Sequence, residues 1–455
     1  MAMQKNMTMG NPFLLLTGFV LPIFVGNLFQ QLYLMSDTII VSRLLGVDAL
    51  AAVGAVSPFS FMVVGFAQGL TMGFTAILSQ RFGAGDHEGM RKVYAMSSLL
   101  SIVISFLLTL IFTFLSRPML KIVNTPENIL DMAVEYISII YIFLIFQVLY
   151  NLYSGVLRSL GDSNSPLIFM IISAITNIIL DIVAIAVFHM GVGGAALATV
   201  ISQGISALLC YIYIKKKFTI LKPSKEEMKF DKSLSKVLLR VGLPGAFQYS
   251  ITAISCILVQ ASLNNFGSDS VAAYSVASKI ENMVTQFYPA LGIGISTYAG
   301  QNLGAGELKR VRKGFRVSVY MNIIYSILAL LLCRFFASPM TMIFIKGGSS
   351  ETVIQESILY VHTMSLFFIP LGFIFIFRTG CQGLGSGKIP MLSAIIELVA
   401  RTCTAFTLPY FFGFLGICLS NAVSWISAGF ILPFVYLSFM KKLEGTNKEI
   451  ANKLS

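Results

Sequence analysis

The sequence predicts an all-α integral membrane protein with twelve transmembrane helices in two six-helix halves. Three observations lead to this fold class. Of the 455 residues, 56% are hydrophobic and only 11% are charged, whereas soluble domains carry roughly a quarter charged residues. Apolar runs of about twenty residues recur along the chain, and each is long enough to cross a ~30 Å hydrocarbon core. Finally, the second half of the chain repeats motifs of the first half.

The internal repeat is visible in motifs that return at a nearly constant offset. Gln80–Gly85 reads Q-R-F-G-A-G, and Gln301–Gly306 reads Q-N-L-G-A-G, 221 positions later. Other pairs keep the same order: Gly46 with Gly267, Pro22 with Pro244, Leu160-Gly161 with Leu384-Gly385, and Gly191 with Gly413. A basic stretch with nine Lys and Arg residues separates the halves, at 215–240. We therefore predict an N-lobe at 1–214, a cytoplasmic basic linker at 215–240 and a C-lobe at 241–455.

The expected spans, taken in order, differ in their polar content. Span 1 contains Pro22, and an interior proline removes one backbone hydrogen bond, so we expect a bend there. Span 2 is rich in glycine, which permits close helix contacts, and spans 3 and 4 carry few polar residues. Span 5 holds Asn177 and Asp181, and span 6 holds Thr199. The second half repeats this order, but no carboxylate stands where Asp37 or Asp181 would map. The spans are 14–42, 49–78, 94–116, 132–156, 166–188, 193–214, 241–264, 271–299, 315–337, 354–378, 388–411 and 415–439.

The net charge of +12 is a signal of membrane topology. With the N-terminus in the cytoplasm, 25 of the 32 Lys and Arg residues fall in cytoplasmic ends and loops. Five fall outside (Arg43, Arg117, Lys121, Arg334 and Lys346), and Lys279 and Arg401 lie within spans. This positive-inside bias predicts a multi-pass protein of the cell (plasma) membrane with both termini and the linker in the cytoplasm. The distribution argues against nucleic-acid binding.

Several classes of function have no support in the sequence. The six cysteines are scattered without a C-x-x-C motif, so they indicate neither a disulfide framework nor a metal site. There is no P-loop for ATP and no H-E-x-x-H motif. No Ser/His/Asp set appears either. We therefore expect no cofactor and no enzymatic activity.

Two carboxylates lie within spans of the N-lobe, where an ionisable group costs about 2.5–3.5 kcal/mol on insertion scales. Counting ~1.5 Å per residue from the outer ends places Asp37 and Thr199 about 9 Å deep and Asp181 about 12 Å deep. Asn177 lies one turn from Asp181 on the same face. Each residue could instead be hydrogen-bonded separately within the bundle. The matched depth across three spans favours one site, either a set of oxygen ligands for Na⁺ or a carboxylate pair that shares one proton.

The C-lobe contains a second group of charged residues within its spans. Glu397 and Arg401 are four residues apart, with the acid first, which favours an intrahelical ion pair. Lys279 and Glu281 are two residues apart and therefore do not face each other. These four residues could form a cluster that neutralises itself and has a purely structural role. In that case, exchanging Glu397 and Arg401 should retain much of the activity.

These features resemble the multidrug and toxic compound extrusion (MATE) family over nearly the whole chain. The resemblance is carried by Pro22 and Asp37 on span 1, Asn177-x3-Asp181 on span 5, Thr199 on span 6, the duplicated Gln…Gly-Ala-Gly tails and the twelve spans. It implies two six-helix lobes related by pseudo-twofold symmetry around a V-shaped cavity. It also implies a cation site at Asp37, Asn177, Asp181 and Thr199, with the bend at Pro22. Span 7 carries no acid, which puts a second cation site in the C-lobe in doubt.

The resemblance implies a secondary-active antiporter that exports amphipathic, often cationic, organic compounds in exchange for Na⁺ or H⁺. Such efflux would confer antibiotic resistance. Its partners would be these small molecules and membrane lipid, and we expect a monomer. The 21 Met and 37 Phe residues suit a promiscuous apolar cavity. A lipid-linked-oligosaccharide flippase of the same superfamily is the alternative, although it should have a cationic cavity and often fourteen spans. A receptor or membrane enzyme would not need acids at matched depths.

Overall fold

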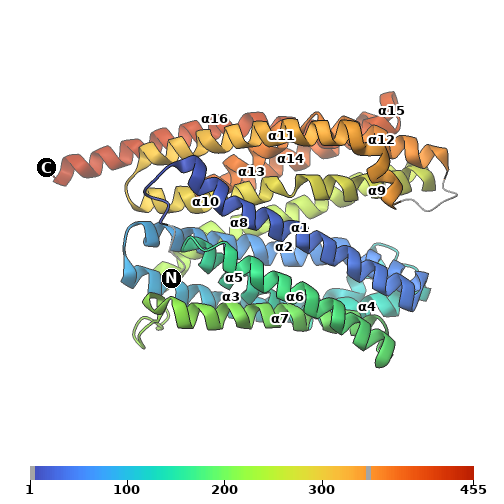
Figure 1. Cartoon of the computed structure of the whole chain (residues 1–455), viewed down its shortest axis with the longest axis horizontal. Helices are drawn as coiled ribbons and strands as arrows, with labels where there is room; N and C mark the ends of the chain where they lie inside the picture. Colours follow the sequence, from blue (N-terminus) through green and yellow to red (C-terminus); the bar gives the residue numbers. More distant parts are fainter. Residues whose placement is uncertain (1–5, 345–349, 455) are drawn as a thin grey trace. The chain divides into compact units, whose positions relative to one another are not determined.

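The computed structural model describes residues 6–344 and 350–454, and this part of the chain is almost entirely helical, with no β-strand (Figure 1). The expected outside residue Lys346 lies beyond the described residues. The α-helices are α1 (Pro12–Leu45), α2 (Val47–Gly83), α3 (His87–Ile122), α4 (Glu127–Ile142), α5 (Leu144–Ser159), α6 (Asn164–Ile182), α7 (Gly191–Lys217), α8 (Lys232–Leu263), α9 (Ser268–Thr285), α10 (Phe287–Gly304), α11 (Leu308–Phe344), α12 (Glu351–Ser365), α13 (Phe368–Gly383), α14 (Lys388–Thr407), α15 (Pro409–Phe412) and α16 (Phe414–Leu454).

The helices account for the twelve predicted spans. Within the described residues, nine helices are long and apolar enough to cross a membrane alone. Two bent pairs are long enough together: α4 with α5, bent by 47°, and α12 with α13, bent by 54°. The remaining span, 271–299, corresponds to α9 and α10, which are separated only by Gln286. The protein is therefore a multi-pass membrane protein.

Proline explains two of the three interrupted spans. Pro289 is the third residue of α10, and Pro370 is the third residue of α13. Proline is tolerated in the first turn of a helix, but it cannot donate a hydrogen bond back to the preceding turn. The preceding helix therefore ends a few residues before each proline. No proline lies near the break between α4 and α5, and the sequence pattern alone did not indicate it.

The chain divides into two compact units that do not coincide with the two halves of the sequence. Unit 1 is formed mainly by Leu21–Ser250, and unit 2 by Met7–Val20 with Ile251–Ser455. The first helix of each half, α1 or α8, is thus divided between the units. In α1 the boundary between the units follows Val20, and Pro22 lies two residues after Val20. The basic stretch at 215–240 belongs to unit 1, where Leu221 and Leu238 are buried in the hydrophobic core.

The backbone carries the same turns in both halves of the chain. Gly46 before α2 has φ 89°, and Gly267 before α9 has φ 88°. Gly85 and Gly306, at the ends of the two Gly-Ala-Gly motifs, have φ 67° and 77°. Residues with a side chain rarely adopt these left-handed conformations. The glycine repeat in the sequence therefore corresponds to repeated turns in the fold.

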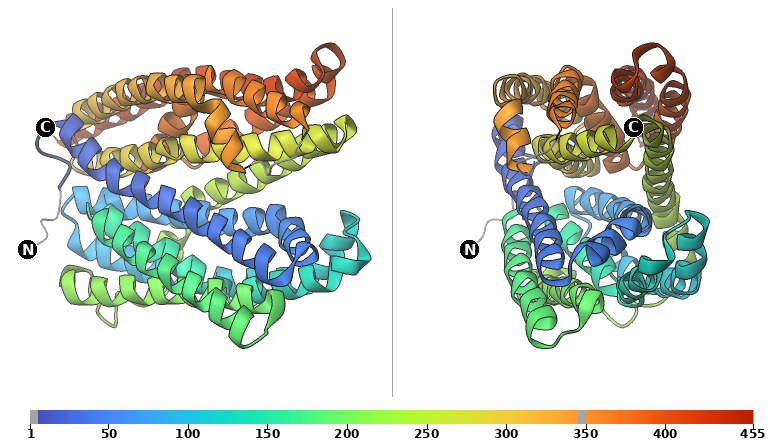
Figure 2. Two further views of the ribbon diagram at one scale, coloured as in Figure 1. Left: turned by 45° about the vertical axis from the view of Figure 1, so that its right-hand side comes forward. Right: turned by 90° about the vertical axis from the view of Figure 1, so that its right-hand side faces the viewer.

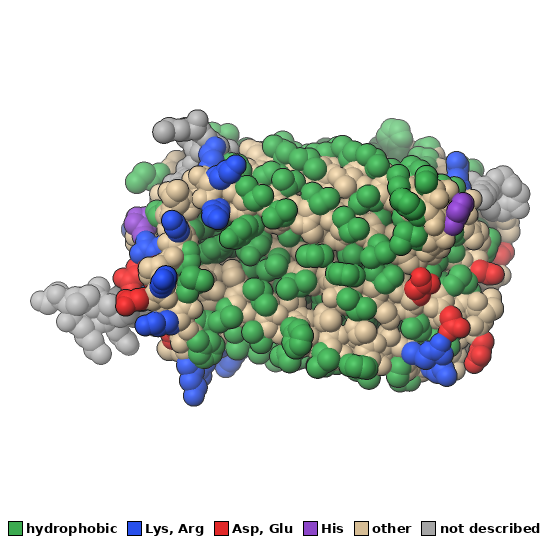
Figure 3. Space-filling model, turned by 90° about the horizontal axis from the view of Figure 1, so that it is seen from below, with side chains coloured by type: hydrophobic (Ala, Val, Ile, Leu, Met, Phe, Trp, Pro, Cys, Tyr) green, Lys and Arg blue, Asp and Glu red, His purple; other side chains and the backbone are tan. Residues whose placement is uncertain are grey.

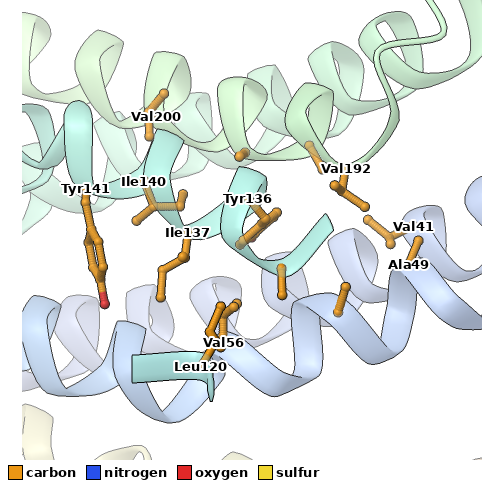
Figure 4. Packing of buried hydrophobic residues seen from close by; sticks show 14 of the residues in the cluster. Val41, Ala49, Val56, Leu120, Tyr136, Ile137, Ile140, Tyr141, Val192 and Val200 are labelled. Carbon is orange, nitrogen blue, oxygen red and sulfur yellow. The ribbon is translucent and has the colours of Figure 1, made fainter. Parts of the chain in front are cut away.

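Within unit 1, α5 and α6 both pack along α7 (Figure 2). A core cluster joins α2, α4 and α7 and contains Val56, Ile137 and Val200 (Figure 4). Tyr136 on α4 belongs to this cluster and is only 8% exposed. The packing fixes α4 and α7 side by side, which positions the polar residues described below.

The surface of the helices is apolar along most of its length. Large side chains such as Phe106, Phe114 and Phe335 are more than half exposed, and exposed apolar surface of this extent indicates contact with lipid. On the face shown in Figure 3, hydrophobic side chains cover the middle, and many Lys and Arg side chains gather near one end. The middle of this face fits a hydrocarbon core and its basic end fits a polar membrane surface.

Candidate functional site

Unit 1 brings together the four residues of the predicted N-lobe site. Asp37 comes from α1, Asn177 and Asp181 from α6, and Thr199 from α7. Asn177 and Asp181 share one face of α6 because they are four residues apart. Both are fully buried, and Asp37 is 6% exposed. Four polar side chains from three helices therefore meet inside one unit.

A small network of contacts links these residues. The side-chain amide of Asn177 donates to Thr199 Oγ1 over 3.4 Å, and the hydroxyl of Tyr33 donates to the same oxygen over 3.4 Å. The carboxyl groups of Asp37 and Asp181 are close enough to interact directly. Thr199 thus orders the neutral side of the site, and two acids form the other side.

Most carboxyl and amide oxygens of the site lack donors among the described residues. Among the described residues, no hydrogen-bond partner reaches Asp37 Oδ1, Asn177 Oδ1 or either carboxyl oxygen of Asp181. Buried carboxylates without partners are costly. A proton shared between the acids, or a small cation bound by the surrounding oxygens, would remove this cost. The site is made of hard oxygen ligands, which suits Na⁺ rather than a transition metal, and the described residues contain no cluster of three or more His, Cys, Asp or Glu side chains for such a metal.

Two tyrosines border the site and were not predicted from the sequence. Tyr33 lies four residues before Asp37 on α1, so helical spacing could have identified it. Tyr136 on α4 lies near Thr199 and both acids. Span 4 carries few polar residues, so the sequence pattern did not single out Tyr136. Both tyrosines add a hydroxyl to the neutral side of the site.

A small pocket in unit 1 adjoins the site. Tyr33 lines it together with Gln30 on α1, Ser173 on α6 and Gln203 on α7. Ser173 and Gln203 lie one turn away from Asn177 and Thr199, so the polar faces of α6 and α7 continue into this pocket. The side-chain oxygen of Gln203 is buried and has no partner among the described residues. Met170 and Tyr150 supply apolar surface.

The charged residues of unit 2 form a cluster with a partner that sequence reasoning missed. Glu397 Oε1 accepts hydrogen bonds from Arg378 Nη1 at 3.1 Å and from Ser393 Oγ at 3.0 Å. The predicted pair with Arg401 is present but looser, with 4.0 Å between Glu397 Oε2 and Arg401 Nη2. Arg378 is on α13, ten residues before α14 begins, and no local spacing relates it to Glu397. Its guanidinium also lies 5.0 Å from the ring of Phe375.

The other two members of the predicted unit 2 cluster are separated from each other. Glu281 lies within electrostatic reach of Arg401 and accepts a hydrogen bond from the hydroxyl of Tyr360. Lys279 is exposed and has no ion pair among the described residues. The structure therefore brings Glu281, Glu397 and Arg401 together and leaves Lys279 outside the cluster.

Comparison with known proteins gives consistent matches. The MatE family model matches residues 22–183 and 244–407. The probable multidrug resistance protein YoeA of Bacillus subtilis is 30% identical over 353 residues, which cover 76% of this chain and 75% of that protein. The probable multidrug resistance protein NorM of Thermotoga maritima is 27% identical over 434 residues, covering 93% and 90%. A crystal structure of MATE in complex with MaL6 superposes with a TM-score of 0.91 at 22% identity, covering 98% of this chain and 100% of that one.

Proposed function

Because this chain belongs to the multidrug and toxic compound extrusion (MATE) family of membrane transporters, we propose that it exports amphipathic, often cationic, organic compounds in exchange for Na⁺ or H⁺. In this proposal, Asp37 and Asp181 bind the driving cation, and Asn177 and Thr199 supply neutral oxygens. The protein resides in the plasma membrane with both termini in the cytoplasm, as the bias of its Lys and Arg residues indicates.

The observation that supports this proposal is the pair of buried acids, three of whose four carboxyl oxygens have no donor among the described residues. Two neighbouring carboxylates repel each other when both are charged, so the site favours a bound cation over none. A cation that enters removes the repulsion and lets α1 and α6 approach more closely. Binding energy of the cation is then available to favour one conformation of unit 1 over another.

The pocket beside the acids supports the link to substrate. Tyr33 contacts Thr199 at the cation site and also lines the pocket. A movement of Thr199 in the cation site would therefore move Tyr33, which lines the pocket. The pocket has an amphipathic lining, with the apolar Met170 and Tyr150 and the polar Gln30 and Gln203. Its volume of about 30 Å³ holds only a small group of a substrate, because a site for a whole drug-sized compound measures roughly 300–1,000 Å³.

Efflux in proteoliposomes with an imposed ion gradient tests the proposal. Asp37→Asn and Asp181→Asn each remove a charge at nearly constant volume, so each should leave the protein folded and abolish uphill efflux of a fluorescent cation. The double variant should be hardly worse than either single one, because groups that act as a unit are non-additive. Asp48→Asn is the matched control, since Asp48 is an exposed carboxylate at the start of α2. Coupled efflux by the double variant would disprove the site.

The same vesicles distinguish the two cations. Coupling to Na⁺ predicts efflux that depends on a sodium gradient after the pH gradient has been collapsed. Coupling to H⁺ predicts that collapsing the pH gradient stops efflux. Thr199→Val removes one neutral ligand and should weaken the dependence on the cation without abolishing it. Equal efflux without any ion gradient would contradict antiport altogether.

A further inference from the structure

Arg401 in unit 2 is a buried arginine with most of its donors unused. Its side chain is 7% exposed, and a guanidinium has five N–H donors. Among the described residues, it makes one hydrogen bond, from Nη1 to Ser255 Oγ over 3.2 Å. Its Nε has no partner there, and Nη2 remains 4.0 Å from Glu397. Such a group is expensive to bury.

The acids near Arg401 are occupied by other donors. Glu397 directs its Oε1 to Arg378 and Ser393. Glu281 attracts Arg401 electrostatically, but its hydrogen bond comes from Tyr360. Tyr360 is in turn approached by Asn421 Nδ2 at 3.5 Å, and Asn421 also donates to Tyr274 at 3.1 Å. The acids are thus held in place by their own partners, and none of them fully satisfies Arg401.

Arg401 lies within the apolar span of α14, away from the lipid headgroups at the membrane surface. It lies thirteen residues after Lys388 at one end of α14 and six residues before Thr407 at the other, which is about 20 Å and about 9 Å along the helix. Arg401 therefore lies nearly two turns inside the apolar span, whereas a lipid headgroup sits at the membrane surface. An ionisable residue at such depth that faces protein is a candidate for a substrate pathway.

An exposed residue lies next to Ser255, the hydrogen-bond partner of Arg401. Cys256 follows Ser255 on α8, its side chain is exposed, and it lies within electrostatic reach of Arg401. A molecule that occupies the surface at Cys256 would therefore lie within electrostatic reach of the guanidinium. Arginine binds carboxylates and phosphates with two parallel hydrogen bonds, and the unused Nε and Nη2 of Arg401 can form such a pair.

We propose that Arg401 binds the anionic group, a carboxylate or phosphate, of amphipathic compounds that the protein transports. This inference rests on the proposed efflux function and extends its substrates from cations to zwitterions and organic anions. Arg401 would then bind the negative group of a substrate, whereas Asp37 and Asp181 in unit 1 bind the driving cation. Glu397 and Arg378 form the neutral support that keeps Arg401 in position.

Two dyes that differ in one group test this inference. Rhodamine B carries a free carboxylate, and rhodamine B ethyl ester has that group blocked. Equilibrium binding is measured without an ion gradient in phosphatidylcholine nanodiscs. Arg401→Gln should weaken binding of rhodamine B about 10- to 100-fold, as expected for loss of a charge-assisted hydrogen-bond pair, and should leave binding of the ester unchanged. Lys279→Gln, which removes an exposed cation on α9, should change neither.

A second measurement keeps Arg401 intact in case its variant does not fold. In a protein whose other five cysteines are replaced, rhodamine B should protect Cys256 from maleimide labelling, and the ester should protect it less. Nanodiscs containing phosphatidylglycerol should give the same result, whereas loss of protection there would show that lipid headgroups occupy the site. Equal effects of Arg401→Gln on both dyes, or none on either, would overturn the inference while the efflux proposal stands. If the unaltered protein binds the ester but not rhodamine B, the inference alone is wrong. If it binds neither dye, both proposals fail.

Discussion

Replacing the two partners of the Glu397–Arg378 ion pair one at a time should have unequal effects on stability. Glu397→Gln leaves Arg378 and Arg401 buried without their shared carboxylate. Breaking a buried pair in this way costs about 3–5 kcal/mol. Arg378→Met instead leaves Glu397 with its 3.0 Å hydrogen bond from Ser393 and with Arg401 at 4.0 Å. A movement of about 1 Å would turn that contact into a charge-assisted hydrogen bond, so we expect a loss of about 1–2 kcal/mol.

The assay is the melting temperature of purified protein in detergent. Arg378→Met should melt only slightly below the unaltered protein, and Glu397→Gln clearly lower. The melting temperature of the double variant should lie between those of the single variants, because the double variant lacks one of the two guanidiniums that Glu397→Gln leaves without a carboxylate. Equal losses for the two single variants would refute the reasoning, since they would show that Arg401 cannot take the place of Arg378.

The presence of Arg378 also changes what an exchange of charges should do. The sequence suggested that exchanging Glu397 and Arg401 would retain much of the activity. In the structure, an arginine at position 397 would face Arg378 from the other side of the 3.1 Å ion pair. Exchanging Arg378 and Glu397 with each other is therefore the better tolerated change. Expression level and melting temperature of the two exchanged proteins compare these outcomes directly.

Three further predictions follow from unit 1. A Cβ on Gly69 would lie 2.2 Å from the carbonyl oxygen of Gly245, so Gly69→Ala should lower the stability of the protein by about 1–3 kcal/mol. Gly54→Ala is the control, because a Cβ at Gly54 meets nothing within 4 Å. Equal melting temperatures of the two variants would contradict this prediction. Lys225→Cys, in a protein without its native cysteines, should not be labelled by an impermeant thiol reagent added outside intact cells. Efficient labelling would show that the 215–240 stretch lies outside the cell. The backbone N–H of Ser224, with the guanidinium of Arg91, holds the pKa of Glu227 below its ordinary value. The stabilisation from this group is therefore present above the unfolded pKa and is lost as the pH falls through the lowered one. Trypsin should cut the 215–240 stretch faster in Glu227→Gln than in the unaltered protein at neutral pH. Unchanged cutting would show that the contacts of Glu227 with Ser224 and Arg91 do not hold this stretch in place.

The sequence could predict the features that depend on residues close together along the chain. Twelve spans follow from apolar runs, and the repeated turns follow from glycines such as Gly46 and Gly267. Asp37, Asn177, Asp181 and Thr199 could be placed at one depth because helical rise is constant. These predictions needed only local spacing and the thickness of a bilayer.

Features that depend on packing between distant helices could not be predicted in this way. The ion pair between Arg378 and Glu397 joins α13 to α14, and depth alone does not specify which side chains face each other. The burial of Leu221 within unit 1 could not be predicted either, because a basic stretch usually indicates a solvated linker. The looser contact between Glu397 and Arg401 shows the same limit, since helical spacing allows a pair but does not set its length.

Whether Pro22 is a point of conformational change can be tested against its repeat partner, Pro244. Both prolines lie within helices that continue past them, α1 and α8, so a bend at Pro22 stays a prediction. Pro22 leaves the carbonyl of Gly18 without an intrahelical donor, which weakens α1 close to Val20, where the chain passes from unit 2 to unit 1. Beyond Pro22, α1 carries Asp37 into the acid site, whereas α8 carries no acid.

Pro22→Ala restores one backbone donor and stiffens α1, so it should slow transport turnover while leaving equilibrium binding of a fluorescent cation unchanged. Pro244→Ala makes the same chemical change in α8 and should have a smaller effect on turnover, because that helix holds no residue of the cation site. Turnover measured in proteoliposomes and affinity measured in detergent separate the two quantities. If both substitutions slow turnover equally, a general effect of helix stiffness explains the result. If Pro22→Ala weakens binding instead, the proline shapes the site itself, and the idea of a bend in α1 that is coupled to the acids is wrong.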